Sequence, residues 1–159
     1  MKKPVKILLV EDNPADIRWT VEIFKEYHIP NEIQSVKDGA EALNFLYKKG
    51  KYKDNFYPDI IILDLYLPRI NGHEVLKRIK NDKNLNSIHV VILTASNSPE
   101  DAKTAYKNHA DCYISKPLDF RGLMKIIQRT GKFRLTVPAM TSKSKCQKCD
   151  IFSFKHYPV

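Results

Sequence analysis

Pro58-Asp-Ile-Ile-Ile-Leu-Asp-Leu-Tyr-Leu-Pro68 is the stretch of sequence that decides the fold. Four consecutive apolar residues, 60–63, stand between Asp59 and Asp64. A short apolar run bounded by turn residues is typical of a strand that is buried on both faces, as in a parallel sheet. Asp64 then lies where the strand ends, and open parallel sheets form their ligand crevice at that edge.

Similar apolar runs recur along the chain and alternate with helical patterns. Strands are predicted at residues 5–10, 33–36, 59–64, 88–93 and 111–114. Helices are predicted to begin at Asn13-Pro14, after Asp38-Gly39, after Asn71-Gly72, at Ser98-Pro99 and at residue 118. Asn or Ser followed by Pro is a strong N-terminal signal for a helix, and Gly50 is expected to end the second helix. The alternation predicts a parallel sheet with helices on both faces.

The composition is that of one domain with a basic tail. The chain has 159 residues, 43% of them apolar, and a net charge of +9. Residues 131–159 carry six basic residues against one acidic residue, a net +5, which leaves +4 for residues 1–130. No apolar run approaches the roughly 20 residues that span a membrane, and residues 5–10 are too short for a signal peptide core. Three cysteines, an odd number, argue against a disulfide framework. A cytoplasmic protein is therefore expected.

Polar side chains follow four of the predicted strands. Glu11 and Asp12 follow the first strand, Asp64 the third, Thr94 the fourth and Lys116 the fifth. Right-handed crossovers bring these strand ends to one edge of the sheet. Each residue alone would be an ordinary cap or surface group, but packing does not explain the set.

Three carboxylates at one edge repel one another, and a hard divalent cation resolves that conflict. Mg²⁺ prefers oxygen ligands and needs only a few carboxylates because it keeps several waters. Lys116 supplies a second, compact positive charge. Such a site suits a phosphoryl group, with Asp64 as the nucleophile that forms an aspartyl phosphate.

At this point the motifs resemble a known family, the receiver domains of two-component response regulators, of the single-domain type related to chemotaxis regulators. The resemblance covers residues 5–130 and is carried by Leu8-Leu-Val-Glu-Asp-Asn13, Asp38-Gly-Ala-Glu-Ala-Leu43, Pro58 to Pro68, Asn71-Gly72, Leu93-Thr-Ala95 and Tyr113-Ile-Ser-Lys-Pro117. The segment Val10-Glu-Asp-Asn-Pro-Ala-Asp16 and the long loop before the third strand resemble the small regulators that are paired with phytochrome kinases.

The resemblance implies a flavodoxin-like fold, with five parallel strands in the order 2-1-3-4-5 and helices on both faces. It also implies that a histidine kinase, of the phytochrome type, transfers a phosphoryl group to Asp64. By the same resemblance Mg²⁺ is bound by Glu11, Asp12, Asp64 and the main-chain carbonyl of Tyr66. Thr94 and Lys116 are expected to contact the phosphoryl oxygens.

The resemblance further implies a conformational switch. Lys116-Pro117 is expected to be a cis peptide bond. On phosphorylation Thr94 moves toward the phosphate and Tyr113 swings inward, so that the face formed by the last two helices and the fifth strand changes its protein partners. The protein is then a phosphoacceptor that acts on a downstream protein and not a turnover enzyme.

Tyr66 departs from the small polar residue that the family often has two positions after the phosphoacceptor. A bulky side chain there could shield the acyl phosphate from water. Slow autodephosphorylation is therefore expected, with faster loss of phosphate in a Tyr66→Asn variant.

The tail also departs from the family, which usually ends near residue 130. Residues 131–159 are expected either to be partly disordered or to contribute to a homodimer interface through residues 133–137. Cys146-Gln-Lys-Cys149 and His156 are one ligand short of a structural zinc site. Cys112 could complete that site, but its place in a strand predicts a core residue.

Three other functions are alternatives to a phosphorylation switch. The main alternative is a DNA-binding transcriptional regulator that uses the basic tail, although the tail has too little helical periodicity for a helix-turn-helix. A phosphatase of the haloacid dehalogenase type needs a second aspartate where this chain has Tyr66. A nucleotide-binding flavodoxin-like protein needs a phosphate-binding glycine loop, and Glu11-Asp12 occupy that position.

Overall fold

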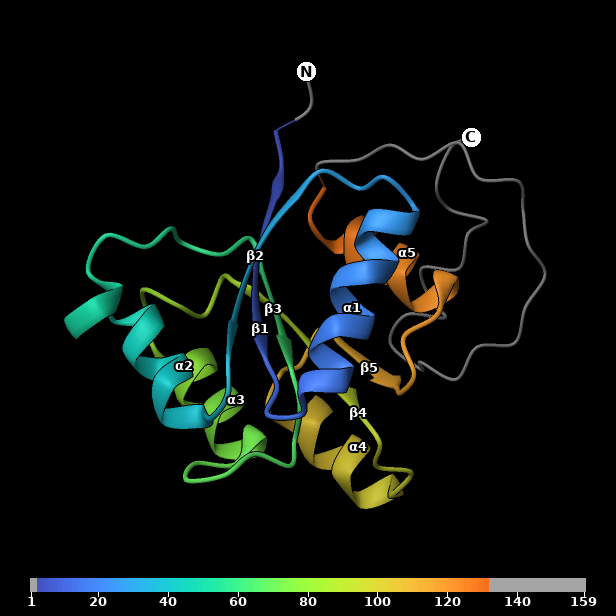
Figure 1. Cartoon of the computed structure of the whole chain (residues 1–159). Helices are drawn as coiled ribbons and strands as arrows, with labels where there is room; N and C mark the ends of the chain where they lie inside the picture. The colour runs from blue at the N-terminus through green and yellow to red at the C-terminus, as the bar shows by residue number, and fades with distance from the viewer. Residues whose placement is uncertain (1–2, 132–159) are drawn as a thin grey trace.

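Five parallel strands form one sheet in the order β2-β1-β3-β4-β5 in the computed structural model, which describes residues 3–131 (Figure 1). The strands are β1 (Val5–Val10), β2 (Asn31–Val36), β3 (Ile60–Leu63), β4 (His89–Thr94) and β5 (Cys112–Ser115). The helices are α1 (Pro14–Glu26), α2 (Gly39–Leu46), α3 (Gly72–Asn81), α4 (Pro99–Lys107) and α5 (Phe120–Arg129), with a 3-10 turn η1 (Gly50–Tyr52). The predicted α/β class and strand order are confirmed.

Helices cover both faces of the sheet, and β3 lies at its centre. Side chains of β3 alternate between two apolar clusters: Ile60 and Ile62 pack on the α1 and α5 side, and Ile61 and Leu63 on the side of α2, α3 and α4. All four are completely buried. Successive residues of a strand point to opposite faces, so a continuous apolar run is what a strand covered on both sides requires.

Each of the five helices begins with a side chain that accepts a hydrogen bond from a main-chain amide of the first turn. The capping residues are Asn13, Asp38, Asn71, Ser98 and Asp119. Such a cap stabilises a helix by about 1 kcal/mol. Because each helix here starts after a strand has ended, the caps fix the loops along the carboxyl edge of the sheet, where the site lies.

Several boundaries differ from the sequence prediction. Strands β3, β4 and β5 begin one residue later than expected, and α5 begins at Phe120 and not at residue 118. Strand β2 begins at Asn31, two residues earlier than expected. Helix α2 ends at Leu46, before the expected Gly50, and Lys48 just beyond it adopts the left-handed conformation (φ 54°). The loop expected at residues 51–58 also holds the end of η1. Within residues 3–131, no helix combines the length and apolar character that spanning a membrane requires.

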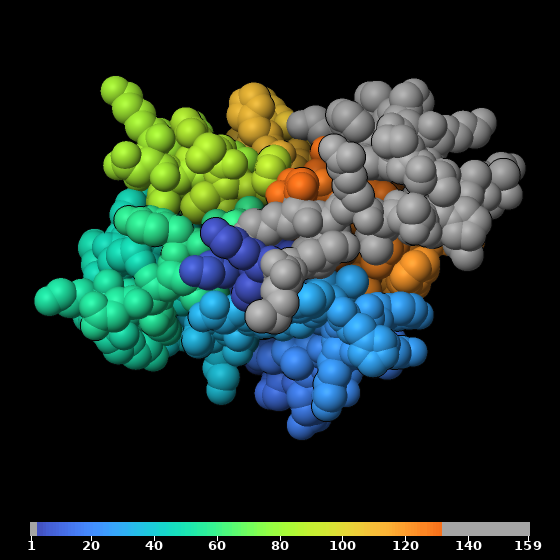
Figure 2. Space-filling model, turned by 90° about the horizontal axis from the view of Figure 1, so that it is seen from above, coloured from blue at the N-terminus to red at the C-terminus, as the bar shows by residue number. Residues whose placement is uncertain are grey.

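The edge where the strands begin carries a different kind of polar cluster. Figure 2 looks onto this edge, with the start of β1 in dark blue. Asp111, just before β5, accepts hydrogen bonds from the Val90 amide (2.7 Å) and from Lys80 Nζ (3.1 Å), and His89 Nδ1 lies 3.4 Å away. Burial acts to raise the pKa of Asp111, but these partners outweigh it and lower the pKa from 3.8 to about 2.

An Asp111→Asn variant is expected to lose about 2 kcal/mol of stability at pH 7, because a depressed carboxylate pKa stabilises the folded state by about 1.4 kcal/mol per unit. The contribution is present above the unfolded-state pKa and is lost as the pH falls from about 4 toward 2. Urea unfolding of both proteins at several pH values measures it. A stability difference that stayed constant down to pH 2 would contradict this account of Asp111.

Candidate functional site

Three acidic side chains meet at the carboxyl edge of the sheet. Glu11 and Asp12 follow β1 and Asp64 follows β3, and one ligand oxygen from each lies within 4.8 Å of the others. Glu11 and Asp64 are buried, with 3% and 6% of their surface exposed, whereas Asp12 is exposed. A set of carboxylate oxygens open to solvent on one side suits a hard divalent cation. The donor chemistry of the site therefore fits the metal that the sequence predicts.

Lys116, at the end of β5, joins these acids. Its Nζ lies 2.5 Å from Glu11 Oε2 and 2.8 Å from both Asp16 Oδ2 and Asp64 Oδ2. Burial opposes the charge of Lys116, but the hydrogen bonds to the three carboxylates hold its pKa above the usual value. The Lys116–Pro117 peptide bond is cis. The cluster thus holds a permanent ammonium group beside Asp64.

The pKa of Glu11 reflects the electrostatic repulsion among the acids at this edge. Burial raises the pKa of Glu11, and the charge of Asp64 adds to the effect. Hydrogen bonds from Lys116 and from the Asn13 amide (3.0 Å) work in the opposite direction. A further positive charge near Glu11 and Asp64 would relieve this conflict, as expected of a cation-binding site.

Gly72 allows the first turn of α3 to pack closely against the main chain of Asp64 and Leu65. A Cβ atom at this position would lie 2.1 Å from the Asp64 carbonyl oxygen and 2.6 Å from Leu65 Cα. Both atoms belong to the main chain, so a side chain at position 72 would push the helix away from the end of β3. The sequence predicts only a turn at Asn71-Gly72, whereas the structure gives the glycine a packing role.

Thr94 and Tyr113, the two predicted switch residues, are linked through Ser96. Thr94 ends β4 and is completely buried, and its Oγ1 accepts a hydrogen bond from the Ser96 amide (3.3 Å). The Tyr113 hydroxyl donates to the Ser96 carbonyl oxygen (3.3 Å). Tyr113 is only 8% exposed. Its side chain therefore already lies inward in this structure, in the position that the sequence analysis expects after phosphorylation.

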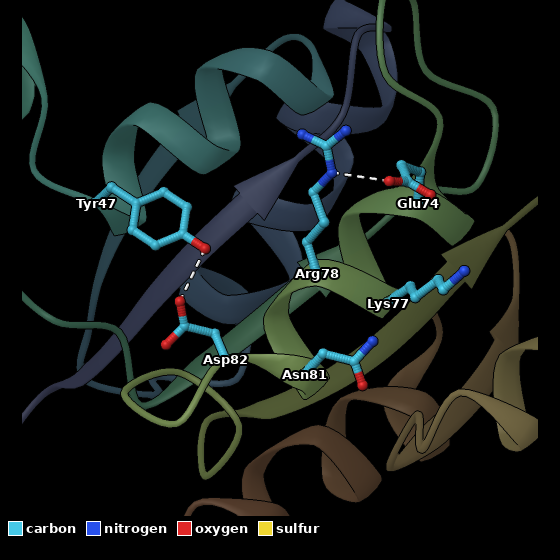
Figure 3. Close-up of a pocket in the computed structure, with 6 residues that line it drawn as sticks. All are labelled: Tyr47, Glu74, Lys77, Arg78, Asn81 and Asp82. Atoms are coloured by element: carbon cyan, nitrogen blue, oxygen red, sulfur yellow. Dashed lines mark hydrogen bonds and ion pairs between the residues drawn. The ribbon is translucent and has the colours of Figure 1, made fainter.

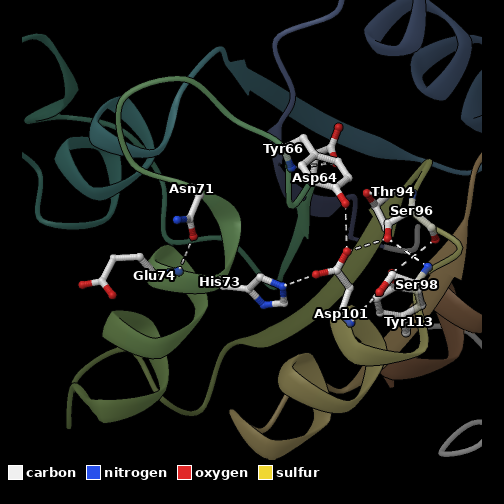
Figure 4. A network of polar contacts seen from close by, with 10 residues as sticks. All are labelled: Asp64, Tyr66, Asn71, His73, Glu74, Thr94, Ser96, Ser98, Asp101 and Tyr113. Atoms are coloured by element: carbon white, nitrogen blue, oxygen red, sulfur yellow. Dashed lines mark hydrogen bonds and ion pairs between the residues drawn. The ribbon is translucent and has the colours of Figure 1, made fainter.

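Tyr66 belongs to a second polar network beside the acidic cluster (Figure 4). Its amide donates to Asp64 Oδ1 (3.3 Å), and its hydroxyl donates to Asp101 Oδ2 in α4 (2.9 Å). The sequence predicts no role at the site for Asp16 or Asp101. Asp16 ends the motif Val10 to Asp16, and Asp101 is predicted only as an acidic residue at the start of a helix.

A groove between α2 and α3, of about 320 Å³, lies elsewhere (Figure 3). It is lined by Tyr47, Glu74, Lys77, Arg78, Asn81 and Asp82. Tyr47 donates to Asp82 (2.9 Å) and Arg78 to Glu74 (2.8 Å), so these polar groups satisfy one another. None of the lining residues belongs to the acidic cluster of Glu11, Asp12 and Asp64 or contacts Lys116 by an ion pair. The groove is therefore separate from the acidic site.

Several sequence predictions concern residues outside the described range 3–131. These are the dimer contact at residues 133–137 and the zinc ligands Cys146, Cys149 and His156, as well as the disorder expected of the tail. Cys112 lies inside the range and is completely buried in the apolar cluster on the α1 and α5 side, as expected of a core residue.

Comparisons with known proteins show the family to which this chain belongs. A model of the response regulator receiver domain matches residues 7–128. Response regulator Rcp1 from Synechocystis sp. is 40% identical over 139 residues, which cover 86% of this chain and 95% of that protein.

Two solved structures are also similar to this chain. The phosphorylated cyanobacterial phytochrome response regulator RcpA has a TM-score of 0.69 and 41% identity, with coverage of 80% of this chain and 90% of that one. The Mn²⁺-bound form of Rcp1 has a TM-score of 0.70 and 37% identity, with coverage of 87% and 100%.

Proposed function

Since this chain belongs to the family of response regulator receiver domains of two-component signalling, as its motifs predict, we propose that Asp64 accepts a phosphoryl group from a histidine kinase. The observation that carries the proposal is the position of Asp64: it directly follows the central strand, among two other acids, with an ammonium group 2.8 Å away. A carboxylate oxygen of Asp64 attacks the phosphorus of a phosphohistidine, the P–N bond breaks, and an aspartyl phosphate forms. The protein then acts as a phosphoacceptor switch and not as a turnover enzyme.

The neighbouring residues supply the charges that this transfer needs. Lys116 can move from Asp64 to a phosphoryl oxygen with little displacement, because its Nζ is already in contact with the carboxylate. Thr94, at the end of the adjacent strand β4, offers a hydroxyl donor for another phosphoryl oxygen. Charge stabilisation of this kind is the main contribution that proteins make to phosphoryl transfer.

We propose Mg²⁺ as the cation, bound by Glu11, Asp12, Asp64 and the main-chain carbonyl of Tyr66. The all-oxygen donor set supports a hard divalent cation, and the relative Rcp1 has a Mn²⁺-bound form. When bound, such a cation neutralises charge on the phosphoryl oxygens.

The partners follow from the relatives and from the switch residues. Phytochrome response regulators among the similar structures support a histidine kinase of the phytochrome type. The contact of Tyr113 with the loop after Thr94 supports signalling to an unidentified downstream protein through α4, β5 and α5.

A homodimer and a cytoplasmic location stay predictions from the sequence. The DNA-binding alternative is not favoured, because the match with the response regulator Rcp1 covers 95% of that protein and 86% of this chain.

Incubation with acetyl phosphate and Mg²⁺ is expected to add one phosphoryl group to the protein, detected by intact mass spectrometry. Excess EDTA is expected to prevent the addition, because the acids alone repel an anionic donor. Restoring Mg²⁺ in excess of the chelator is the control, and it should restore the adduct. A protein that gained no phosphoryl group with Mg²⁺, or gained it equally in EDTA, would refute the proposed chemistry.

A further inference from the structure

Asp101 accepts hydrogen bonds from three side chains that come from different parts of the chain. Its Oδ2 accepts from the Tyr66 hydroxyl (2.9 Å) and from Ser96 Oγ (2.5 Å), and His73 Nε2 lies 3.0 Å from its Oδ1 (Figure 4). An ionised carboxylate can only accept, so the histidine donates here. Asp101 thus joins the loop after β3, the first turn of α3, the loop after β4 and the first turn of α4.

This carboxylate is well suited to remain ionised. Hydrogen bonds from Ser96 and His73 lower the pKa of Asp101; burial opposes them, and the hydrogen bond from Tyr66 lowers the pKa further. The side chain of Asp101 is 22% exposed and that of His73 is 25% exposed. The Nδ1 atom of His73 is buried and has no hydrogen-bond partner among the described residues. The polar contact of the His73 ring is therefore the one between Nε2 and Asp101. Hydrogen bonds to an ionised acceptor are roughly twice as strong as neutral ones.

Tyr66 is hydrogen-bonded at both its main-chain amide and its side-chain hydroxyl, so its ring is held beside the acidic site. Its amide is bonded to Asp64, and its hydroxyl is bonded to Asp101 in the first turn of α4. Asp101 is in turn bonded to Ser96, two residues after Thr94. The ring therefore extends from the end of β3 past the end of β4, although 62% of the residue is exposed to solvent. An aromatic side chain this exposed would be mobile without an anchor at its hydroxyl.

We propose that Asp101 is a positioning residue that holds the Tyr66 ring across the mouth of the Asp64 site and so prolongs the life of the aspartyl phosphate. The inference rests on the proposed function, because it needs a phosphoryl group on Asp64. Hydrolysis requires a water molecule on the open side of the phosphorus, and a fixed ring occupies that approach more of the time than a free one. Asp101 acts through Tyr66, and it does not touch the reacting atoms.

The test compares phosphate lifetimes in four variants after removal of the donor, with Mg²⁺ present. Tyr66→Phe removes only the anchored hydroxyl, Asp101→Ala removes the anchor, and the third variant combines both changes. Glu100→Ala is the matched control: it removes an acid from the same turn of α4, but its side chain is 82% exposed and forms one long ion pair within residues 3–131, with Lys103 at 3.9 Å. Thermal unfolding of each variant verifies that it is folded.

Each single change at Tyr66 or Asp101 is expected to shorten the half-life about fivefold, the effect of losing the net stabilisation of one typical hydrogen bond. The double variant should also be about fivefold faster and not about 25-fold, because both changes break one link. Glu100→Ala should keep the parental half-life. A parental half-life in Asp101→Ala, or effects that multiply in the double variant, would overturn the inference and leave the proposed function intact. A parent protein that takes up no phosphoryl group would overturn both.

Discussion

Replacement of Asp64 by Asn is expected to abolish phosphorylation, with a loss of at least about 1,000-fold in the rate of phosphoryl uptake. An amide has nearly the size of a carboxylate but is not a nucleophile at neutral pH. The variant keeps Glu11, Asp12 and Lys116, so the charges that attract the donor and the cation are largely preserved. The rate is measured as phosphoryl incorporation from acetyl phosphate by intact mass spectrometry.

Asp54→Asn is the matched control for this loss, because it makes the same chemical change in an exposed loop residue. It should be phosphorylated at the parental rate. Persistence of the adduct in Asp64→Asn would mean that another group accepts the phosphoryl group. Glu11 and Asp12 would then be the first candidates, since their carboxylates lie in the same cluster.

A Lys116→Met variant is expected to be about 3 kcal/mol less stable than the parent in the absence of divalent cations, the lower end of the range for removing one partner of a buried ion pair. Methionine keeps most of the aliphatic stem, so the loss reports on the charge. Without the ammonium group, Glu11 and Asp64 stay buried close to each other, and Asp16 loses its partner as well. Urea unfolding in EDTA measures the difference.

Added Mg²⁺ should recover part of this loss, since a ligand that binds only the folded state stabilises it. Lys25→Met is the control: this lysine is 77% exposed, and its ion pair in the described part of the chain is a long one, with Glu22 at 4.0 Å. Its replacement should therefore change stability by less than about 0.5 kcal/mol. Equal stability of Lys116→Met and the parent in EDTA would contradict the importance of Lys116 to the acidic cluster.

The sequence predicts the fold because the fold depends on local patterns. The apolar run at residues 60–63 indicates a strand covered on both faces, and the structure places those residues in two clusters on opposite sides. Pro after Asn13 and after Ser98 marks helix starts, and both residues cap their helices. The ends of helices depend on the conformation of single residues, such as Lys48, and were less well predicted.

The candidate site is predictable only in part, for a physical reason. Chain topology brings the ends of parallel strands together, so residues directly after a strand, such as Asp64 and Lys116, could be recognised. Asp16 and Asp101 lie within helices, and they reach the site through the direction of their side chains. Asp16 meets a lysine that is 100 residues away in sequence. No periodicity in the sequence encodes such a contact.

The role of Tyr66 is predicted from the sequence, but the contact that holds its side chain is visible only in the structure. Its place two residues after Asp64 suggested that it shields the phosphoryl group. The structure shows that the Tyr66 hydroxyl is bonded to Asp101 in α4, a carboxylate that also accepts hydrogen bonds from His73 and Ser96. The lifetime of the signal is therefore expected to depend on residues of α3 and α4 as well as on Tyr66 itself.

The most direct test of the central claim is to locate the phosphoryl group within the chain. Borohydride reduction of the phosphorylated protein converts an aspartyl phosphate to homoserine, and peptide mass spectrometry then identifies the modified position. The account predicts homoserine at position 64, only after treatment with donor and Mg²⁺. Conversion at Asp12, or no conversion in a protein that carries the phosphoryl mass, would contradict it.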